Sequence, residues 1–169
     1  MLIAMSLGRS FKHFYHSFRP VFKTFSEESL ERITKAIDES EKFHDAELVF
    51  AVESSISSLA AFKGLTAQQR SFDVFSQLRV WDTEKNNGVL IYLLLADRDI
   101  EIVLDRGIYS ITKPEQWENI CQQMESKFRQ NLFEEGVLEG IGSISAILKS
   151  HFPKTANDRN EIPNRPVIL

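Results

Sequence analysis

The sequence predicts an α/β protein, a three-layer α/β/α sandwich built on a mixed sheet of about four strands. Two segments, residues 46–54 and 88–96, are almost wholly apolar, as strands are when helices cover both faces of their sheet. A helical pattern lies between them, so they should be parallel and joined by a right-handed crossover. A tight turn after residue 96 leads into an alternating segment, which predicts one antiparallel hairpin.

The first helix and the crossover helix both carry capping signals. A stripe of apolar residues predicts a helix to about residue 43, and Ser26 is a good N-cap for it. Thr66 and Gln69 have the spacing of a capping box and predict the crossover helix, which should end near residue 78. The expected order up to this point is helix, strand, helix, strand.

Two more helices are expected after the hairpin, whose second strand covers residues 100–104. Pro114 should open a helix that runs to about residue 128. A last helix should cover residues 133–151 and stop before Pro153. The predicted order for the whole chain is therefore α-β-α-β-β-α-α.

The chain is long enough for one substantial hydrophobic core, since 43% of its 169 residues are hydrophobic. We expect a domain over residues 26–152, between an arm at residues 1–25 and a tail at residues 153–169. The arm is rich in aromatic and basic residues but lacks a long helical period. It could dock on the domain itself, on a partner or on a membrane surface, and docking on the domain is the simplest interpretation.

Composition excludes several classes of function. Twenty basic and twenty-four acidic residues give a formal charge of -4, so there is no general electrostatic reason to bind nucleic acid. Cys121 is the only cysteine and can form neither an internal disulfide nor a Cys-based zinc site. No signal peptide and no apolar run of about 18 residues is visible. We therefore expect a cytoplasmic protein with an unknown protein partner, at most peripheral to the inner membrane.

Polar residues gather at both ends of the second apolar strand. At about 3.3 Å per strand residue, the two groups lie about 25 Å apart and cannot share one ion. We predict that one rim of the sheet carries Asp82, Glu84, Asn87 and Asp105, with Arg79 and Arg106 beside them. We predict that the opposite rim carries Glu53, Ser54, Ser55, Asp97, Arg98 and Asp99.

Both rims offer hard oxygen ligands without clustered Cys or His, which favours Ca²⁺ or Mg²⁺ as a bound ion. The candidate metal ligands are Glu53, Asp97 and Asp99 at one rim and Asp82 and Asp105 at the other. A bound cation could hold a phosphate, with an arginine as a fork for its oxygens. The candidate catalytic residues are Asp97, Arg98, Asp105 and Arg106. The rim at the carboxyl ends of the parallel strands, with Asp97, is favoured.

Each cluster also has a structural interpretation. Asp97-Arg98-Asp99 could be a polar hairpin tip, because Asp is common in turns. Asn86-Asn87-Gly88 could be a turn that supplies a positive φ. Asp105-Arg106-Gly107 could be an ion pair and a turn. Glu53 has fewer such explanations, because carboxylates are rarely buried at the end of a strand.

Three stretches of the chain resemble the TPM domain, a family named for thylakoid lumen, photosystem II repair and nematode membrane proteins. These stretches are ITKAIDESEKFHDAELVFAVES, NNGVLIYLLLADRDIEIVLDRGI and WENICQQMESKFRQNLFEEGVLEGIGSISAILKSHFP. Together they cover about residues 26–152. RVWDTEKNNGVLIY and the final NEIPNRPVIL are similar to a compact soluble bacterial branch of that family.

The resemblance implies an α/β/α fold, calcium binding, and a role in assembling or maintaining membrane complexes; acid phosphatase activity is implied by a plant member. Two hypotheses follow. The preferred one is a module that binds a divalent cation or a protein partner through the same carboxylates. The alternative is a hydrolase of phosphomonoesters, for which the chain lacks a Gly-rich phosphate loop and any G-x-S-x-G elbow.

Overall fold

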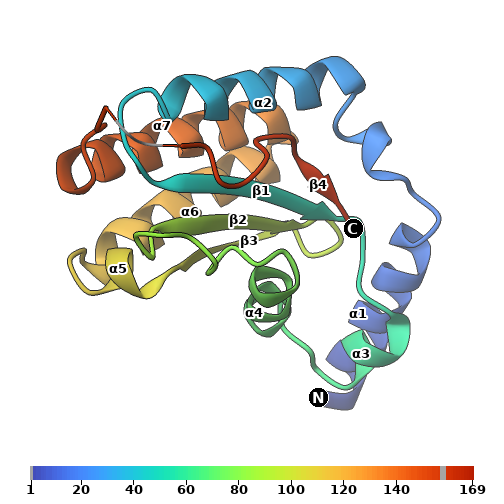
Figure 1. The fold of residues 1–169 in the computed structure, drawn as a ribbon. Helices are drawn as coiled ribbons and strands as arrows, with labels where there is room; N and C mark the ends of the chain where they lie inside the picture. Colours follow the sequence, from blue (N-terminus) through green and yellow to red (C-terminus); the bar gives the residue numbers. More distant parts are fainter. Residues whose placement is uncertain (1, 157–158) are drawn as a thin grey trace.

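The computed structural model describes residues 2–156 and 159–169, and its centre is a four-stranded mixed sheet (Figure 1). The strands are β1 (Glu47–Glu53), β2 (Gly88–Leu94), β3 (Asp99–Leu104) and β4 (Val167–Ile168), in the order β3-β2-β1-β4. β1 is parallel to β2 and to β4, and β2 is antiparallel to β3. The predicted α/β class, with one parallel crossover and one antiparallel hairpin, is confirmed.

Helices surround this sheet in the predicted order, with the short helices η1 (Val21–Lys23), α3 (Ser58–Phe62) and α5 (Arg106–Tyr109) and the 15-residue helix α1 (Leu2–His16) in addition. The other helices are α2 (Glu27–Ser40), α4 (Ala67–Gln77), α6 (Pro114–Arg129) and α7 (Phe133–His151). The predicted caps are present: the Ser26 side chain accepts from the backbone N–H of Ser29, and Thr66 and Gln69 form a capping box.

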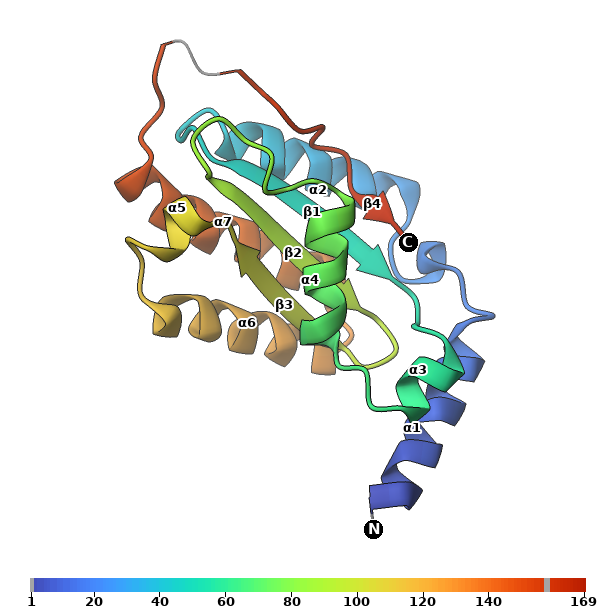
Figure 2. The same ribbon diagram turned by 60° about the horizontal axis from the view of Figure 1, so that its bottom comes forward.

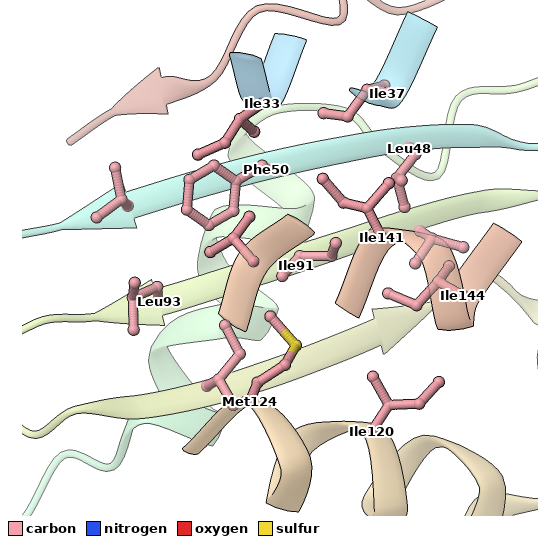
Figure 3. Close-up of a cluster of buried hydrophobic side chains, with 14 of the residues drawn as sticks. Ile33, Ile37, Leu48, Phe50, Ile91, Leu93, Ile120, Met124, Ile141 and Ile144 are labelled. Carbon is pink, nitrogen blue, oxygen red and sulfur yellow. The ribbon is translucent and has the colours of Figure 1, made fainter. Parts of the chain in front are cut away.

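Helices α2, α6 and α7 cover one face of the sheet and form the larger core (Figure 3). Alternate strand residues such as Phe50 and Ile91 point into this layer, where they meet Ile33 of α2, Met124 of α6 and Ile141 of α7. All of these side chains are at most 2% exposed. The burial of both sheet faces explains why the sequence of β1 and β2 does not alternate.

The other face of the sheet is covered by α4 and by the segment that returns from α4 to β2 (Figure 2). Leu90 and Leu94 of β2 point to this side and pack with Val74 of α4 and Val80 of the returning segment. The three layers predicted from the two apolar strands are therefore present, with a single long helix in the thinner outer layer.

Two terminal segments take regular structure that the sequence pattern did not predict. Residues 2–16 of the arm form α1, a helix that packs on α3 beyond the end of β1 (Figures 1 and 2). Near the end of the tail, Val167 and Ile168 pair with Ala51 and Val52 of β1 and supply the fourth strand. In residues 6–16 the apolar residues lie on the exposed side of the helix and polar residues such as His13 on the buried side, the reverse of the usual pattern, and a two-residue strand is too short to show alternation.

The loop before β2 explains the Asn-Asn-Gly sequence. Asn86 takes a left-handed backbone conformation with φ 52°, as the turn interpretation expected. Gly88 is needed for a different reason, because a Cβ atom there would lie 1.9 Å from the carbonyl oxygen of Val80. Asn87 is buried, and its side-chain amide donates to the carbonyl of Asp45. The loop is thus held on both sides by backbone contacts.

No helix in the described part of the chain is both long and apolar enough to cross a membrane.

Candidate functional site

The turn between β2 and β3 carries Asp97, Arg98 and Asp99, and each of these side chains contacts a different part of the structure. Asp97 contacts α1, Arg98 reaches the carboxyl end of α6 and the residue beyond it, and Asp99 lines a groove along β3. Arg98 has φ 56°, a left-handed conformation that makes the turn tight. The three residues therefore do not act as one cluster.

Asp97 is the anchor of α1. Its Oδ2 atom accepts from the Nη2 atom of Arg9 at 2.8 Å and lies 3.1 Å from Nε2 of His13, while Lys12 Nζ lies 3.7 Å from Oδ1. Burial would raise the pKa of Asp97, but the hydrogen bonds from His13 and Arg9 outweigh it and hold this pKa well below its usual range. The carboxylate stays ionised and is already surrounded by bases.

Arg98 helps to form a basic pocket of about 560 Å³ next to α1. The bases that line this basic pocket are Lys12, His16, Arg19, Lys23 and Arg98, and none of the described carboxylates lines it. The Nη2 atom of Arg98 donates to Oδ1 of Asn131 at 2.9 Å, and its guanidinium lies over the ring of Phe133. These contacts hold Arg98 in place without neutralising its charge.

Asp99 belongs to an open groove of about 480 Å³ that follows edge strand β3 between α4 and α6. Its acidic lining residues are Asp99, Glu101, Glu118 and Glu125, and no lysine, arginine or histidine in the described part of the chain lines it. Apolar walls come from Ile102 and Phe72 among others. We call this feature the acidic groove.

Negative charge in the acidic groove is only partly neutralised. Glu125 pairs with Arg129 at 2.8 Å, but Asp99 and Glu101 form no ion pair among the described residues. Burial, together with the charges of Asp99 and Glu125, raises the pKa of Glu101 to about 7. Burial and the charge of Glu125 also raise the pKa of Asp99. A cationic group placed here would remove this repulsion.

The side chain of Glu53, at the end of β1, lies on the face of the sheet that α4 covers, and it is hydrogen-bonded there. Its carboxylate accepts from Arg70 of α4 at 2.8 and 3.2 Å and from the hydroxyl of Tyr92 at 2.6 Å. Burial and the hydrogen bond to Glu53 raise the pKa of Tyr92. The arrangement fastens α4 to the sheet, and it keeps Glu53 apart from the side chains of Asp97 and Asp99.

At the other rim the predicted residues have separate structural partners. Asp82 pairs with Arg79 at 2.6 Å in solvent, and Arg106 donates to Oδ1 of Asn86 at 2.9 Å. Asp105 is buried and caps α5 by accepting from the backbone N–H of Arg106. The backbone N–H of Glu84 donates to Glu161. These residues order the loops around β2 and do not converge on one point.

A further buried carboxylate, Asp45, lies close to this rim and is not among the site residues predicted from the sequence. Asp45 precedes β1 and binds Lys85 and both the hydroxyl and the backbone N–H of Thr155. Burial would raise the pKa of Asp45, but the hydrogen bonds from Lys85 and Thr155 outweigh it and lower this pKa to about 2. Asp45 therefore joins the start of β1, the loop before β2 and the tail.

The carboxylates of the two rims do not assemble into a cation site. Among the residues that the structure describes, no three His, Cys, Asp or Glu side chains lie in a group that could hold a metal ion. Glu53 and Asp97 bind arginines, which compete with any cation, and Asp105 is used as a helix cap. The donor set as it stands does not fit Ca²⁺ or Mg²⁺.

Several residues at these features carry signals that could have been found in the sequence. Arg9 and His13 are four residues apart, so one helix face presents both to the same partner. Glu101 alternates with apolar neighbours on β3, and Glu118 and Glu125 lie two turns apart on the following helix. The basic pocket had no such signal, because Arg98 and Lys23 come together only through the tertiary fold.

Most of the sequence matches the model of a known family. The family model of the TPM domain matches residues 22–147. The chain belongs to the TPM domain family. This TPM domain is also similar to the BA42 protein from the psychrophilic bacterium Bizionia argentinensis, whose NMR structure is 27% identical to it with a TM-score of 0.76. The similarity covers 86% of this chain and 95% of that one. A comparison with curated proteins gave no match.

Proposed function

We propose that this TPM domain is a non-catalytic interaction module whose acidic groove receives a basic segment of a protein partner within a membrane-associated complex. The observation that supports the proposal is the charge that the fold leaves unpaired at Asp99 and Glu101. The other strand-end carboxylates, Glu53 and Asp97, have internal basic partners. Unfavourable charge at an open groove is a feature that a complementary partner relieves.

The groove has the shape for a short segment of chain. It follows edge strand β3, where alternate peptide groups point away from β2. Its apolar walls, including Phe72 and Trp117, offer contacts for aliphatic side chains, while Glu101 and Glu118 can bind lysine or arginine. A basic segment with alternating apolar residues therefore complements the groove in both charge and surface.

A titration with a labelled peptide of alternating lysine and valine tests this proposal. We expect the peptide to bind the wild-type protein and to bind Glu101→Gln/Glu118→Gln at least tenfold more weakly, because two salt bridges are removed. The control variant Glu31→Gln/Asp73→Asn changes the net charge equally on exposed positions of α2 and α4 and should bind like the wild type. Equal weakening in both variants would reduce the interaction to bulk electrostatics and contradict the proposal.

Cys121 provides a local readout for the same titration. It is the only cysteine, it lines the acidic groove, and burial with the charge of Glu101 raises its pKa to about 12. Alkylation of this thiol is therefore expected to be slow, and peptide in the groove should slow it further. An alkylation rate that does not change at saturating peptide would place the peptide elsewhere.

Divalent-cation binding stays a prediction of the family resemblance. A thermal-shift titration with Ca²⁺, Mg²⁺ and EDTA checks it, because an ion that binds only the native state must raise the melting temperature. A rise that is lost in Asp99→Asn or Asp105→Asn would locate the ion. The absence of any shift would remove cation binding from the proposed function.

The alternative function is hydrolysis of phosphomonoesters, and the observation that favours it is the basic pocket, which could bind a phosphate group. The proposed reaction would use Asp97 and Arg98, with Asp105 and Arg106 as the candidates at the other rim. Asp97 is paired with Arg9 and His13, and among the described residues Thr24 alone brings a hydroxyl group to the pocket. Turnover of p-nitrophenyl phosphate by the wild type that disappears both in Asp97→Asn and in Arg98→Gln, with both variants still unfolding cooperatively, would establish the enzyme over the module.

The predicted location is the cytoplasm, peripheral to the inner membrane. Fractionation of cells, with washing of the membrane fraction at high salt, tests it. Release of the protein by salt would support peripheral attachment.

A further inference from the structure

Helix α1 is oriented with its polar side toward the protein. Four side chains on one side of the helix bind the domain: Ser6 donates to the carbonyl of Phe62, Ser10 donates to the carbonyl of Ser58 at 2.9 Å, and Arg9 and His13 bind Asp97. His13 is completely buried. Over residues 6–16, the side of α1 that faces the domain therefore makes hydrogen bonds and ion pairs, the reverse of an ordinary surface helix.

The opposite side of α1 presents aromatic and aliphatic side chains to solvent. At 100° per residue, Leu7, Phe11 and Phe14 fall on one stripe with Tyr15 beside it, and Phe18, just beyond the end of α1, packs edge to face against Phe14. Phe11 is 76% exposed and Phe18 is 70% exposed. Leu59 and Phe62 of α3, which lies next to α1 in both views of the ribbon, are also exposed (Figures 1 and 2). We call this surface the aromatic stripe, and a soluble protein rarely exposes so many aromatic rings without a use for them.

The basic pocket adjoins the aromatic stripe along one flank of α1. Lys12 and His16 lie on that flank, and Arg19 follows the helix with its guanidinium 5.5 Å from the centre of the Tyr15 ring. The positive field is strong enough to affect the histidine: burial and the charges of Arg19 and Lys12 lower the pKa of His16. Lys12 forms a long ion pair with Asp97, at 3.7 Å, whereas Arg19 and Lys23 have no ion pair among the described residues.

The backbone around the pocket supports a role for its charged side chains. Arg98 and Asn131 both line the pocket, and both have a positive φ, 56° and 63°. A left-handed conformation is unfavourable for a bulky side chain such as arginine, for which glycine would be the relaxed choice. Arginine at position 98 places a positive charge in the pocket, although its backbone conformation is less favourable than that of glycine would be.

From these observations we propose that α1 and the basic pocket dock the protein on an anionic phospholipid bilayer, with the aromatic stripe in the interface and a lipid phosphate in the basic pocket. On a helix that lies in the membrane interface, Phe and Leu side chains insert at the boundary between headgroups and acyl chains, and Tyr is favoured at the headgroup level because its ring carries a polar hydroxyl. Bases on the flank of such a helix extend toward the lipid phosphates. An anionic bilayer complements both the aromatic stripe and the bases beside it, since Arg19 and Lys23 have no ion pair among the described residues. This inference is independent of the acidic groove, which lies along β3.

Sedimentation with vesicles tests the docking of the full chain. We expect binding to mixed phosphatidylglycerol and phosphatidylcholine vesicles, and much weaker binding to pure phosphatidylcholine. Arg19→Glu/Lys23→Glu should weaken binding to the anionic vesicles at least tenfold. The control Lys35→Glu/Lys149→Glu makes the same charge change on α2 and α7 and should retain binding. Phe11→Ser/Phe18→Ser should also lose binding, and because both rings are exposed, the variant should melt like the wild type.

Three results would overturn the proposal. One is wild-type protein that does not sediment with either kind of vesicle. Another is equal binding to neutral and anionic vesicles, which would remove the lipid phosphate from the pocket. The third is equal loss in the Arg19/Lys23 variant and in its control.

The protonation of His16 gives a second, local measurement. An anion in the basic pocket should raise the pKa of His16, which NMR can follow in anionic detergent–lipid mixtures and, separately, with inorganic phosphate. We expect a clear rise with the anionic lipid and a smaller one with inorganic phosphate, because the aromatic stripe adds binding energy only at an interface. An unchanged pKa at saturating anionic lipid would contradict placement of the phosphate in the pocket.

Discussion

Single residues of the β2–β3 turn show how one short sequence can serve several purposes. Asp97, Arg98 and Asp99 are adjacent in the chain, but the turn sends one to α1, one to the basic pocket and one to the acidic groove. Residue types alone made all of them candidates for one cation or phosphate site. Whether a carboxylate is available for such chemistry depends on its neighbours, and for Asp97 those neighbours come from the arm.

Asp97→Asn should destabilise the protein by about 1–3 kcal/mol near neutral pH, because it leaves Arg9 without its ion pair. The pKa of Asp97 is lowered in the native state, so its contribution is fully present above the ordinary pKa of aspartate and is lost as the pH falls toward the lower native value. Urea unfolding at several pH values measures this. Asp82→Asn, whose pair with Arg79 is exposed, is the control and should change stability by no more than about 1 kcal/mol. Equal effects of the two substitutions would contradict the anchoring role of Asp97.

Glu101→Gln should change stability in the opposite direction and make the protein more stable near neutral pH. The native pKa of about 7 lies above the ordinary value of 4.5, so the folded protein is penalised as Glu101 ionises. The penalty is absent below the ordinary value, grows as the pH rises, and is complete above the native pKa. Unfolding measurements should find the variant more stable than the wild type by roughly 1 kcal/mol above pH 7, after discounting for solvent screening, and equal to it in acid. A stability difference that does not vary with pH would show that ionisation of Glu101 is not its cause.

At the scale of elements, the strongly patterned segments were predictable and the others were not. β1 and β2 are continuous apolar runs and α2 and α4 carry capping residues, so their places were clear from the sequence. The docking face of α1 could not be predicted from the sequence, because its polar side is the buried one, which inverts the rule that orients surface helices. β4 was missed because a strand of two residues depends entirely on its neighbour β1.

Glycines give a matched test of element packing. Gly88→Ala should destabilise the protein by several kcal/mol, on the order of 3, because the new methyl group would overlap the carbonyl oxygen of Val80 and the returning segment would have to move. Gly142→Ala should stabilise it by up to about 1 kcal/mol, since nothing lies within 4 Å of the new atom and alanine favours the interior of α7. Thermal unfolding of both variants measures the contrast. Similar changes in melting temperature for the two would contradict the close packing at Gly88.

For the whole molecule, the fold could be predicted much further than the sites. Alternation, periodicity and caps are local signals, and they were enough to predict the layers and the crossover. The basic pocket and the acidic groove combine residues from several elements, such as Lys23 with Arg98 and Asp99 with Glu125. Their charge depends on whether the fold places an oppositely charged side chain beside each of these residues. Only tertiary structure decides that balance.

The position of β4 also has a consequence for how the molecule opens. Asp45 and Thr155 lie 110 residues apart in sequence, and together with the short β1–β4 ladder they fasten the tail to the sheet. Further contacts come from Ile162, whose backbone N–H donates to Glu47 at 3.0 Å, and from Asn164, whose side-chain amide donates to Glu41 at 2.7 Å. Closing so long a loop has an entropic cost, so this edge is expected to form late. Separation of the tail would leave backbone N–H and C=O groups of β1 unpaired, with those of Ala51 and Val52 open to another chain. Retention of the tail would then limit self-association as well as complete the sheet.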